Sequence, residues 1–506
     1  MLKIENNTEL SINDVVAVAR KYREVGLSDS AKEAMQKSRG FVEDILRENR
    51  VVYGISTGFG EFSKITISGG DREKLQRNLI LSHSVGVGDF FTEEVVRGIM
   101  LLRVNSLARG FSGIRLSTVE KLIELLNKKI TPAVPQKGSV GASGDLAPLS
   151  HVAAVILGEG YVMKDGAAVP SLPVLKEAGI EPIELAAKEG LALINGTQAM
   201  TSVAALVLHD ARQLLKIADI AAAMSLEALG GTMKAFDERI AKIRPHPGQL
   251  QSVRNINRLT AGSAILKDNK NEKVQDAYSL RCISQVHGAS RDAWMRTLDT
   301  VDIEMNAVTD NPIVMADTGE IVSGGNFHGQ PVALVMDYLK LALAEIGNIS
   351  ERRINRLVDP HLSGLPAFLV KDGGVNSGLM IAQYTAASLV SENKVLVHPA
   401  SADSIPTSAN QEDHVSMGTV AARQAREILD NVRYVLSIEM MAAAQGMDFH
   451  AKKPGVGTHP AYAHIRKLVP FIEKDRILNN DFDAIYGAIA GGTLVREVEE
   501  AVGELE

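Results

Sequence analysis

The sequence predicts a mainly α-helical protein, and three observations support this. Only 4% of the 506 residues are aromatic, whereas a β-sandwich would need many aromatic and β-branched side chains. The length is well above what one hydrophobic core usually accommodates, so at least two domains are expected. Four long segments carry apolar residues at helical spacings of three and four, namely 197–229, 331–353, 376–397 and 412–445. We therefore expect a loop-rich helical domain over 1–196, and a long-helix bundle with a C-terminal helical region over 197–506.

The N-terminal part alternates short helices with glycine-rich connections. Ser11 and Asp14 have the spacing of a helix cap, and Thr92 precedes a second helix that should end near Gly110. Between these helices, residues 53–60 read Tyr-Gly-Ile-Ser-Thr-Gly-Phe-Gly, which predicts a loop. Prolines and glycines predict a second irregular stretch over 132–144.

The long helices of the second part are apolar over much of their circumference. Val332, Val335, Leu339, Ala342 and Ile346 illustrate the pattern. Helices this long and apolar are hard to bury within one chain of short elements. A bundle shared between subunits is therefore expected.

Composition excludes several classes of protein. The net charge of −7 and the lack of a basic stripe make nucleic acid an unlikely partner. With Cys282 as the one cysteine, neither an intrachain disulfide nor a multi-cysteine zinc site can form. The polar first residues do not resemble a signal peptide, and no apolar run reaches the roughly 20 residues that span a bilayer. We expect a cytoplasmic protein that does not bind a membrane.

One segment offers unusual chemistry. Residues 138–151 read Gly-Ser-Val-Gly-Ala-Ser-Gly-Asp-Leu-Ala-Pro-Leu-Ser-His. Gly144 has no side chain, so its nitrogen can approach the carbonyl carbon of Ala142 in a tight turn. Attack and loss of water would close a five-membered imidazolone ring. Ser143 could then lose its hydroxyl as a second water and leave an electrophilic exocyclic methylidene.

Two ordinary readings of this segment fit less well. A phosphate-binding loop would carry the Walker lysine or the Rossmann spacing of glycines, and neither is present. A hydrolase nucleophile elbow would need glycine two residues after the serine, where Asp145 stands, and a hydrophobic strand before it. Ala-Ser-Gly alone is nevertheless a common tripeptide, so the ring needs support from the rest of the chain.

That support is a resemblance that covers nearly the whole chain. Besides the ring segment and the loop at 53–60, five further strings stand in the same order as in the aromatic amino-acid ammonia-lyases and aminomutases. They are Asn-Leu-Ile-Leu-Ser-His at 78–83, Asn-Gly-Thr-Gln at 195–198, Gln-Asp-Ala-Tyr-Ser-Leu-Arg at 275–281, Gly-Asn-Phe-His-Gly at 325–329 and Asn-Gln-Glu-Asp-His at 410–414. The chain is similar to that family, whose prosthetic group is a 4-methylideneimidazol-5-one. The resemblance implies that Ala142, Ser143 and Gly144 form this group and that no external cofactor is required.

The resemblance also implies catalytic roles. Tyr53 matches the family's base for the β-proton, although a tyrosine that only closes a lid would look the same. Tyr278 is a second candidate for proton transfer or ring formation, with packing as the alternative. Glu412 is a carboxylate that can accept the substrate's amine or imidazole. We expect it to open the helix over 412–445, where its role could also be purely electrostatic.

Four further residues are implied in substrate binding. Arg281 matches the residue that holds the substrate carboxylate, because a guanidinium pairs with it through two hydrogen bonds, although a structural salt bridge is the alternative. Asn195 and Gln275 can donate to the ring carbonyl or to the substrate. Phe327 offers a flat wall for an aromatic substrate, but a core phenylalanine would look the same.

The choice of amino acid rests on Ser82 and His83. Relatives that act on phenylalanine tend to have Phe-Leu here, those that act on tyrosine His-Leu, and those that act on histidine Ser-His. An imidazole substrate needs a hydrogen-bonding partner, which His83 supplies. The resemblance therefore implies histidine as substrate, with trans-urocanate and ammonia as products.

Other functions stay open. A tyrosine or phenylalanine lyase, or a 2,3-aminomutase, would use the same ring, and a non-catalytic helical scaffold could keep the fold. No two histidines have the His-x-x-x-His spacing of a helical metal site, so no metal is expected to be required. Since relatives are homotetramers with active sites shared between subunits, the resemblance implies the same assembly here.

Overall fold

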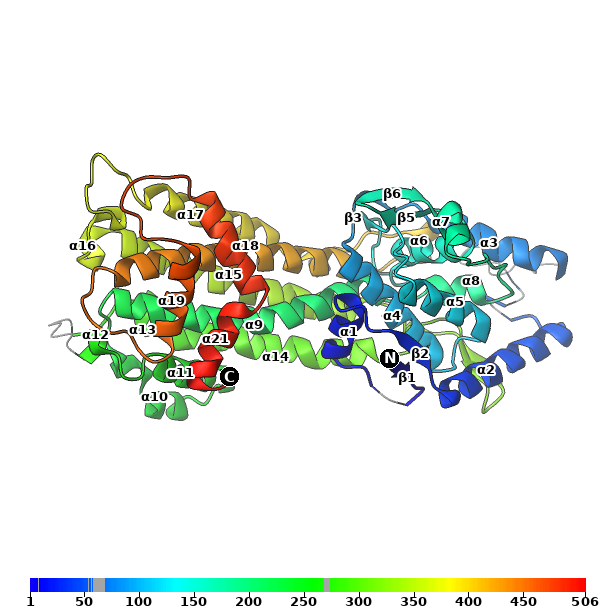
Figure 1. The fold of residues 1–506 in the computed structure, drawn as a ribbon. Helices are drawn as coiled ribbons and strands as arrows, with labels where there is room; N and C mark the ends of the chain where they lie inside the picture. Colours follow the sequence, from blue (N-terminus) through cyan, green and yellow to red (C-terminus); the bar gives the residue numbers. More distant parts are fainter. Residues whose placement is uncertain (8, 53, 56, 58–68, 268–273) are drawn as a thin grey trace. The chain divides into compact units, whose positions relative to one another are not determined.

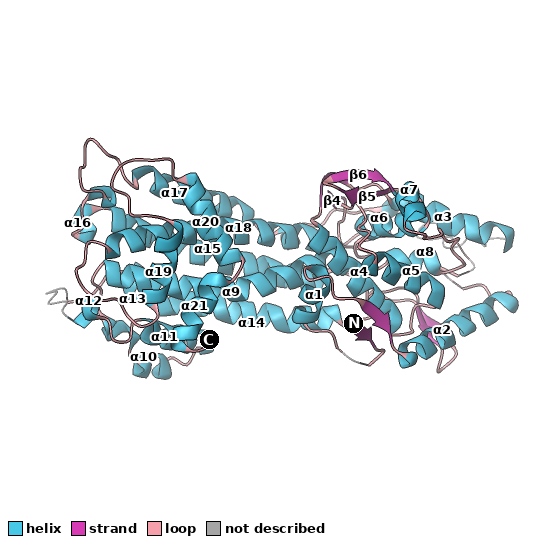
Figure 2. Cartoon of the chain, in the orientation of Figure 1, coloured by secondary structure: helices cyan, strands magenta, loops and turns pink. Residues whose placement is uncertain are grey.

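The computed structural model describes residues 1–7, 9–52, 54, 55, 57, 69–267 and 274–506. It confirms the predicted mainly helical class, and the described strands are short and paired (Figure 2). The chain divides into two compact units, each built from three segments. The first comprises 1–209, 298–337 and 399–423, and the second 210–297, 338–398 and 424–506.

The first unit holds the short elements. Its helices are α1 (Ile12–Ala19), α2 (Asp29–Arg47), α3 (Arg72–His83), α4 (Glu93–Ala108), α5 (Leu116–Asn127), α6 (Leu146–Ile156), α7 (Ser171–Glu177) and α8 (Glu189–Ile194). Its strand pairs are β1–β2 (Leu2–Ile4 and Val25–Leu27, parallel), β3–β4 (Val87–Phe90 and Pro135–Lys137), β5–β6 (Tyr161–Lys164 and Ala167–Pro170) and β7–β8 (Ile313–Met315 and Glu320–Val322). The expected capping box is present, because Ser11 and Asp14 each bond the other's backbone at the start of α1. Thr92 precedes α4 as expected.

Four long helices contribute to both units: α9 (Gln198–Ala228), α14 (Ile283–Met305), α15 (Gln330–Val358) and α18 (Gly418–Met447). Within the second unit these helices lie side by side (Figure 1). The shorter helices of this unit are α10 (Glu238–Ile243), α11 (Pro247–Leu259), α12 (Ala264–Lys267), α13 (Tyr278–Arg281), α16 (Pro360–Ser363), α17 (Met380–Leu396), α19 (Thr458–Leu468), α20 (Asn479–Ala490) and α21 (Thr493–Val502). In the described ranges, no helix is both long and apolar enough to cross a membrane.

Two predicted helix starts are wrong. The helix expected from residue 376 begins at Met380, because Gly378 has a φ of +54°, which a right-handed helix does not allow. Glycine is required at 378, since a Cβ there would overlap the Phe368 carbonyl oxygen. The helix expected from Glu412 begins only at Gly418. Met417, directly before it, has a φ of +58°, which is incompatible with a continuous right-handed helix.

The core of the second unit contains a buried carboxylate shared by three helices. Glu439 of α18 accepts hydrogen bonds from Ser225 of α9 and Ser350 of α15, each at 2.6 Å. Arg353 of α15 forms a two-pronged pair with the same carboxylate, at 2.5 and 2.9 Å. All four side chains are fully buried. Every carboxylate oxygen therefore has partners, as a buried charge requires.

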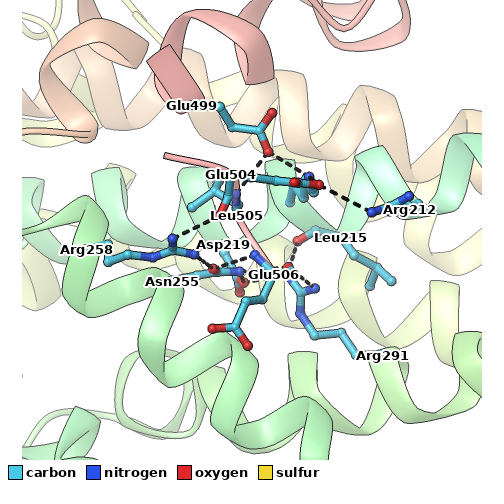
Figure 3. Close-up of polar contacts among 11 residues, drawn as sticks. Arg212, Leu215, Asp219, Asn255, Arg258, Arg291, Glu499, Glu504, Leu505 and Glu506 are labelled. Carbon is cyan, nitrogen blue, oxygen red and sulfur yellow. Dashed lines mark hydrogen bonds and ion pairs between the residues drawn. The ribbon is translucent and has the colours of Figure 1, made fainter. Parts of the chain in front are cut away.

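The last residues of the chain are bound to α11 and α14 (Figure 3). Arg291 donates to the Glu506 carbonyl oxygen at 2.6 Å, and Asn255 donates to the same oxygen at 3.0 Å. Arg258 donates to the carbonyl of Glu504 at 2.9 Å. Asp219 of α9 accepts from Arg291 at 2.6 Å, which links this segment to the buried helices.

His287 lies in this buried network and is held neutral. Its Nδ1 lies 2.7 Å from Asp219, and its Nε2 lies 3.5 Å from a nitrogen of Arg353. Since a guanidinium can only donate, Nε2 must be the acceptor and Nδ1 carries the proton. Burial lowers the pKa of His287 below its usual 6.5, and the charges of Arg353 and Arg291 add to this, against the effect of Asp219.

This predicts a stability that declines in mild acid. Above pH 6.5 His287 is neutral in both folded and unfolded chains and contributes no pH dependence. As the pH falls below 6.5, His287 becomes protonated in the unfolded chain but stays neutral in the folded chain. The free energy of unfolding therefore decreases by up to about 1.4 kcal/mol per pH unit. His287→Gln keeps a donor and an acceptor but does not titrate. Its melting temperature should fall less than the parent's between pH 7.5 and 5.5; equal decreases would show that His287 is not responsible.

Candidate active site

The segment that is predicted to form the ring lies in the first unit, between β4 and α6, in a conformation that only glycine permits at residue 144. Gly144 has a φ of +75°, and a Cβ there would overlap the carbonyl oxygen of Gly196. The backbone N–H of Asp145 donates to that same oxygen at 2.6 Å. The turn at 142–144 is therefore pressed against the turn that joins α8 and α9, and Ala142 within it is buried.

Asp145 anchors this segment. Its fully buried carboxylate accepts from Ser139 at 2.8 Å, from the Thr419 hydroxyl, and from the Met200 N–H at 2.9 Å. Burial raises the pKa of Asp145, and these three donors oppose the rise. The carboxylate thereby ties the turn to the first residues of α9 and of α18.

Asn195 stands beside this turn with one polar atom unused. Its Nδ2 donates to the Asn311 carbonyl at 3.0 Å, but no described residue donates to its Oδ1, which is buried. A buried amide oxygen without a donor is costly, and this oxygen can only accept a hydrogen bond. This is the position where the sequence predicts contact with the ring or the substrate.

One buried cation, Arg103, supports Asn195, and a second, Lys188, is paired with Asp310; neither was predicted from the sequence. Arg103 of α4 donates to the carbonyl oxygens of Asn195 and Ala192, at 3.0 and 2.6 Å. Burial lowers the pKa of Arg103 to about 10, which leaves it charged at neutral pH. Lys188 lies 2.9 Å from Asp310, with both side chains fully buried. The sequence contains no signal that Arg103 and Lys188 are buried, so they look like surface cations until the fold is known.

Glu412 contacts Ser143 directly, although 268 residues separate them in sequence. The Ser143 hydroxyl donates to its Oε1 at 2.6 Å, and the Thr407 hydroxyl donates to its Oε2 at 3.0 Å. Glu412 lies in a loop rather than at a helix start, so the expected helix-terminal electrostatic role is wrong. Its position instead places a carboxylate at the carbon that the sequence predicts to become electrophilic.

His83 occupies the last turn of α3 and is half-buried. Its Nδ1 lies 3.1 Å from the Ser82 hydroxyl oxygen. Burial lowers the pKa of His83, while the Leu79 carbonyl and the negative charge of Glu412 oppose the decrease. The ring is therefore neutral at physiological pH, so that it can offer one donor and one acceptor.

The loop that carries Phe327 also joins the ring segment. The Gly329 N–H donates to the Gly141 carbonyl at 3.2 Å, and Nε2 of His328 lies 3.2 Å from the His414 carbonyl. Phe327 itself is half-buried. In the first unit, the segments of Ser143, Asn195, Phe327 and Glu412 are thus connected by hydrogen bonds.

The other predicted site residues lie elsewhere. Gln275, Tyr278 and Arg281 belong to the second unit, where Arg281 donates to the Gln275 side chain and stacks 4.6 Å from the centre of the Tyr278 ring. Tyr278 is 69% exposed. Tyr53 lies outside the described residues. In the part of the chain that is described, no three His, Cys, Asp or Glu side chains are grouped as metal ligands, and the absence of a metal requirement stays a prediction.

Comparison with known proteins identifies a family and several similar proteins. The family described as aromatic amino acid lyase matches residues 10–467. A curated relative named histidine ammonia-lyase, from Alkaliphilus oremlandii, is 54% identical over 98% of both chains. The crystal structure of histidine ammonia-lyase from Trypanosoma cruzi is 42% identical, with a TM-score of 0.93, over 100% of this chain and 96% of that one. Tyrosine aminomutase from Streptomyces globisporus is 39% identical, with a TM-score of 0.95 over all of both chains.

Proposed function

The chain belongs to the aromatic amino acid lyase family, and we propose that it eliminates ammonia from L-histidine to give trans-urocanate. The choice of histidine as substrate rests on the environment of His83. Its imidazole is half-buried, burial lowers its pKa, and the negative charge of Glu412 acts on it. A polar ring partner favours a substrate whose side chain has nitrogen donors and acceptors. The full-length relatives named histidine ammonia-lyase support the same substrate. The proposed reaction is the first step in the breakdown of histidine.

We propose that Ala142, Ser143 and Gly144 form a 4-methylideneimidazol-5-one. The tight turn fits this chemistry, because the positive φ of Gly144 and its close approach to Gly196 exclude any side chain at the attacking residue. The Gly144 nitrogen attacks the Ala142 carbonyl carbon and one water leaves. Ser143 then loses its α-hydrogen and its hydroxyl as a second water. When formed, the group supplies an electrophilic carbon that captures the substrate and eases the departure of ammonia.

The chain's own residues bind and orient the substrate. Glu412 accepts an N–H group of the substrate, and His83 hydrogen-bonds to its side-chain ring. Arg281 holds the carboxylate, while Asn195 and Gln275 donate to the ring carbonyl or the substrate. Phe327 packs against the aromatic side chain. Tyr53 takes the β-proton, and Tyr278 serves a second proton transfer.

We propose that the protein is a homotetramer whose active sites are shared between subunits. Two observations support this. Tyr278 is 69% exposed in the single chain, which is unusual for a residue that handles protons at an active site. The second unit also exposes large apolar side chains on α15 and α17, among them Leu341 at 48% and Ile381 at 58%.

A panel of histidine, tyrosine and phenylalanine tests the substrate. We expect kcat/KM for histidine to exceed the other two by at least about tenfold, or about 1.4 kcal/mol, which one lost buried hydrogen bond can supply. The readout is product absorbance, with chromatography to detect β-amino acids, the products of an aminomutase.

His83→Leu is the companion variant. It should raise KM for histidine more than it lowers kcat, because the lost contact is to the substrate's side chain and not to the bonds that break. Equal or reversed preference in the parent protein would instead favour a tyrosine or phenylalanine enzyme, to which the likeness to tyrosine aminomutase also points.

A further inference from the structure

The loop from Thr407 to Glu412 has an unusual backbone. Its two ends pair, because the Thr407 N–H donates to the Glu412 carbonyl at 2.9 Å and the Glu412 N–H to the Thr407 carbonyl at 3.3 Å. Between them, Ser408, Ala409 and Asn410 have φ values of 52°, 53° and 67°. Three successive non-glycine residues in the left-handed region are rare and costly. The paired ends hold a conformation that the intervening residues would not adopt by themselves.

A third contact between the same two residues involves their side chains. The Thr407 hydroxyl donates to Oε2 of Glu412 at 3.0 Å, and Oε1 accepts from the Ser143 hydroxyl at 2.6 Å. Thr407 therefore fixes the rotation of the carboxylate about its last torsion, which is otherwise broad. The other oxygen is directed at residue 143 as a result.

The Ser143 hydroxyl is the group that leaves when the methylidene forms. Its departure removes the protein donor to Oε1, while the donor to Oε2 remains. The mature site then contains a carboxylate oxygen that is still held in direction but has lost its partner among the described residues. An acceptor fixed in advance binds an incoming N–H group without having to reorganise.

We propose that Thr407 is a positioning residue of the active site. It holds Glu412 so that Oε1, once vacated by Ser143, accepts an N–H group of the bound amino acid. This inference rests on the proposed function, since it assumes that substrate binds at residue 143. Thr407 acts only through Glu412 and does not itself contact the substrate.

Thr407→Val tests the proposal, because valine keeps the shape and the backbone N–H but removes the hydroxyl. We expect kcat/KM for histidine to fall about 10- to 100-fold, mostly in kcat. The loss of two waters in intact mass and the melting temperature should stay as in the parent. Thr407→Ser restores the hydroxyl and should return activity to within about threefold of the parent.

A matched control separates the carboxylate from the loop. Ser404 also lies in this region, and among the described residues its hydroxyl accepts a hydrogen bond from the Val415 N–H, at 3.1 Å. Ser404→Ala should therefore leave kcat/KM within about threefold. A decrease as large as that of Thr407→Val would mean that loop integrity is the cause, and would overturn the proposal.

A double-mutant cycle with Glu412→Gln identifies the partner. If Thr407 acts through the carboxylate, Thr407→Val should have little further effect once Glu412 is replaced. Full additivity, or an active Thr407→Val protein, would overturn the inference. Failure of the proposed function shows separately, as a parent protein that does not turn over histidine. In that case the same cycle is measured on whichever amino acid the parent does deaminate.

Discussion

Ser143→Ala is expected to leave a folded protein with almost no activity. Alanine has no hydroxyl to eliminate, so the electrophilic carbon cannot form. Without covalent capture of the substrate, kcat should fall by at least about three orders of magnitude, or about 4 kcal/mol. The parent's intact mass should be lower than that of its unmodified sequence by two waters, whereas the variant should lack the second loss. The near-ultraviolet absorbance of the ring system should also disappear.

The fold should survive this change. Ser143 is half-buried, and its hydroxyl donates one hydrogen bond, to Glu412, in the unprocessed chain. The processed parent has already lost this hydroxyl, so the variant loses no hydrogen bond relative to the parent, and its melting temperature should change only slightly. Ser150→Ala is the matched control, because among the described residues the Ser150 hydroxyl donates to the Leu146 carbonyl within its own helix, α6. A parent mass equal to the unmodified sequence would falsify self-processing, whatever the activity of the variant.

Three of the four long helices that contribute to both units could be predicted, because their spacing follows from burial, whereas α14 was not predicted. α9, α15 and α18 pack apolar side chains on several sides, which produces apolar positions three and four residues apart. The start of α18 could not be predicted. Glu412 in Gln-Glu-Asp-His looks like the acidic first turn of a helix, but the left-handed backbone at 408–410 and at Met417 has no recognisable sequence signature. Ser, Ala, Asn and Met are all ordinary helix-compatible residues.

The structure brings together several of the residues that the motifs predict for the site, but the sequence did not predict their contacts. The motif string identifies Ser143 and Glu412 as members, yet no pattern predicts a 2.6 Å contact across 268 residues of sequence. The buried cations near the site could not be predicted from the sequence either. Arg103 and Lys188 are charged residues that sequence alone assigns to the surface, and their burial depends on carbonyl and carboxylate partners from distant segments.

The contacts of the Arg281 guanidinium fit its predicted role in binding a carboxylate. One guanidinium nitrogen donates to Gln275, and the planar group stacks on Tyr278. Its Nε is shielded from solvent, and no described residue accepts its proton. A guanidinium held on one side, with a donor unused, is suited to a carboxylate that accepts two parallel hydrogen bonds.

Arg281→Lys should keep the positive charge but lose the two parallel N–H groups with which a guanidinium binds a carboxylate. Since these two hydrogen bonds orient the substrate as well as bind it, kcat/KM for histidine should fall about 100-fold or more, equivalent to about 2.7 kcal/mol. Inhibition by urocanate, which has a carboxylate, should weaken markedly, whereas inhibition by imidazole, which has none, should hardly change. Arg244→Lys, at an exposed position of the same unit, is the control. Activity within about threefold of the parent, or equal weakening for both inhibitors, would assign Arg281 a structural role instead.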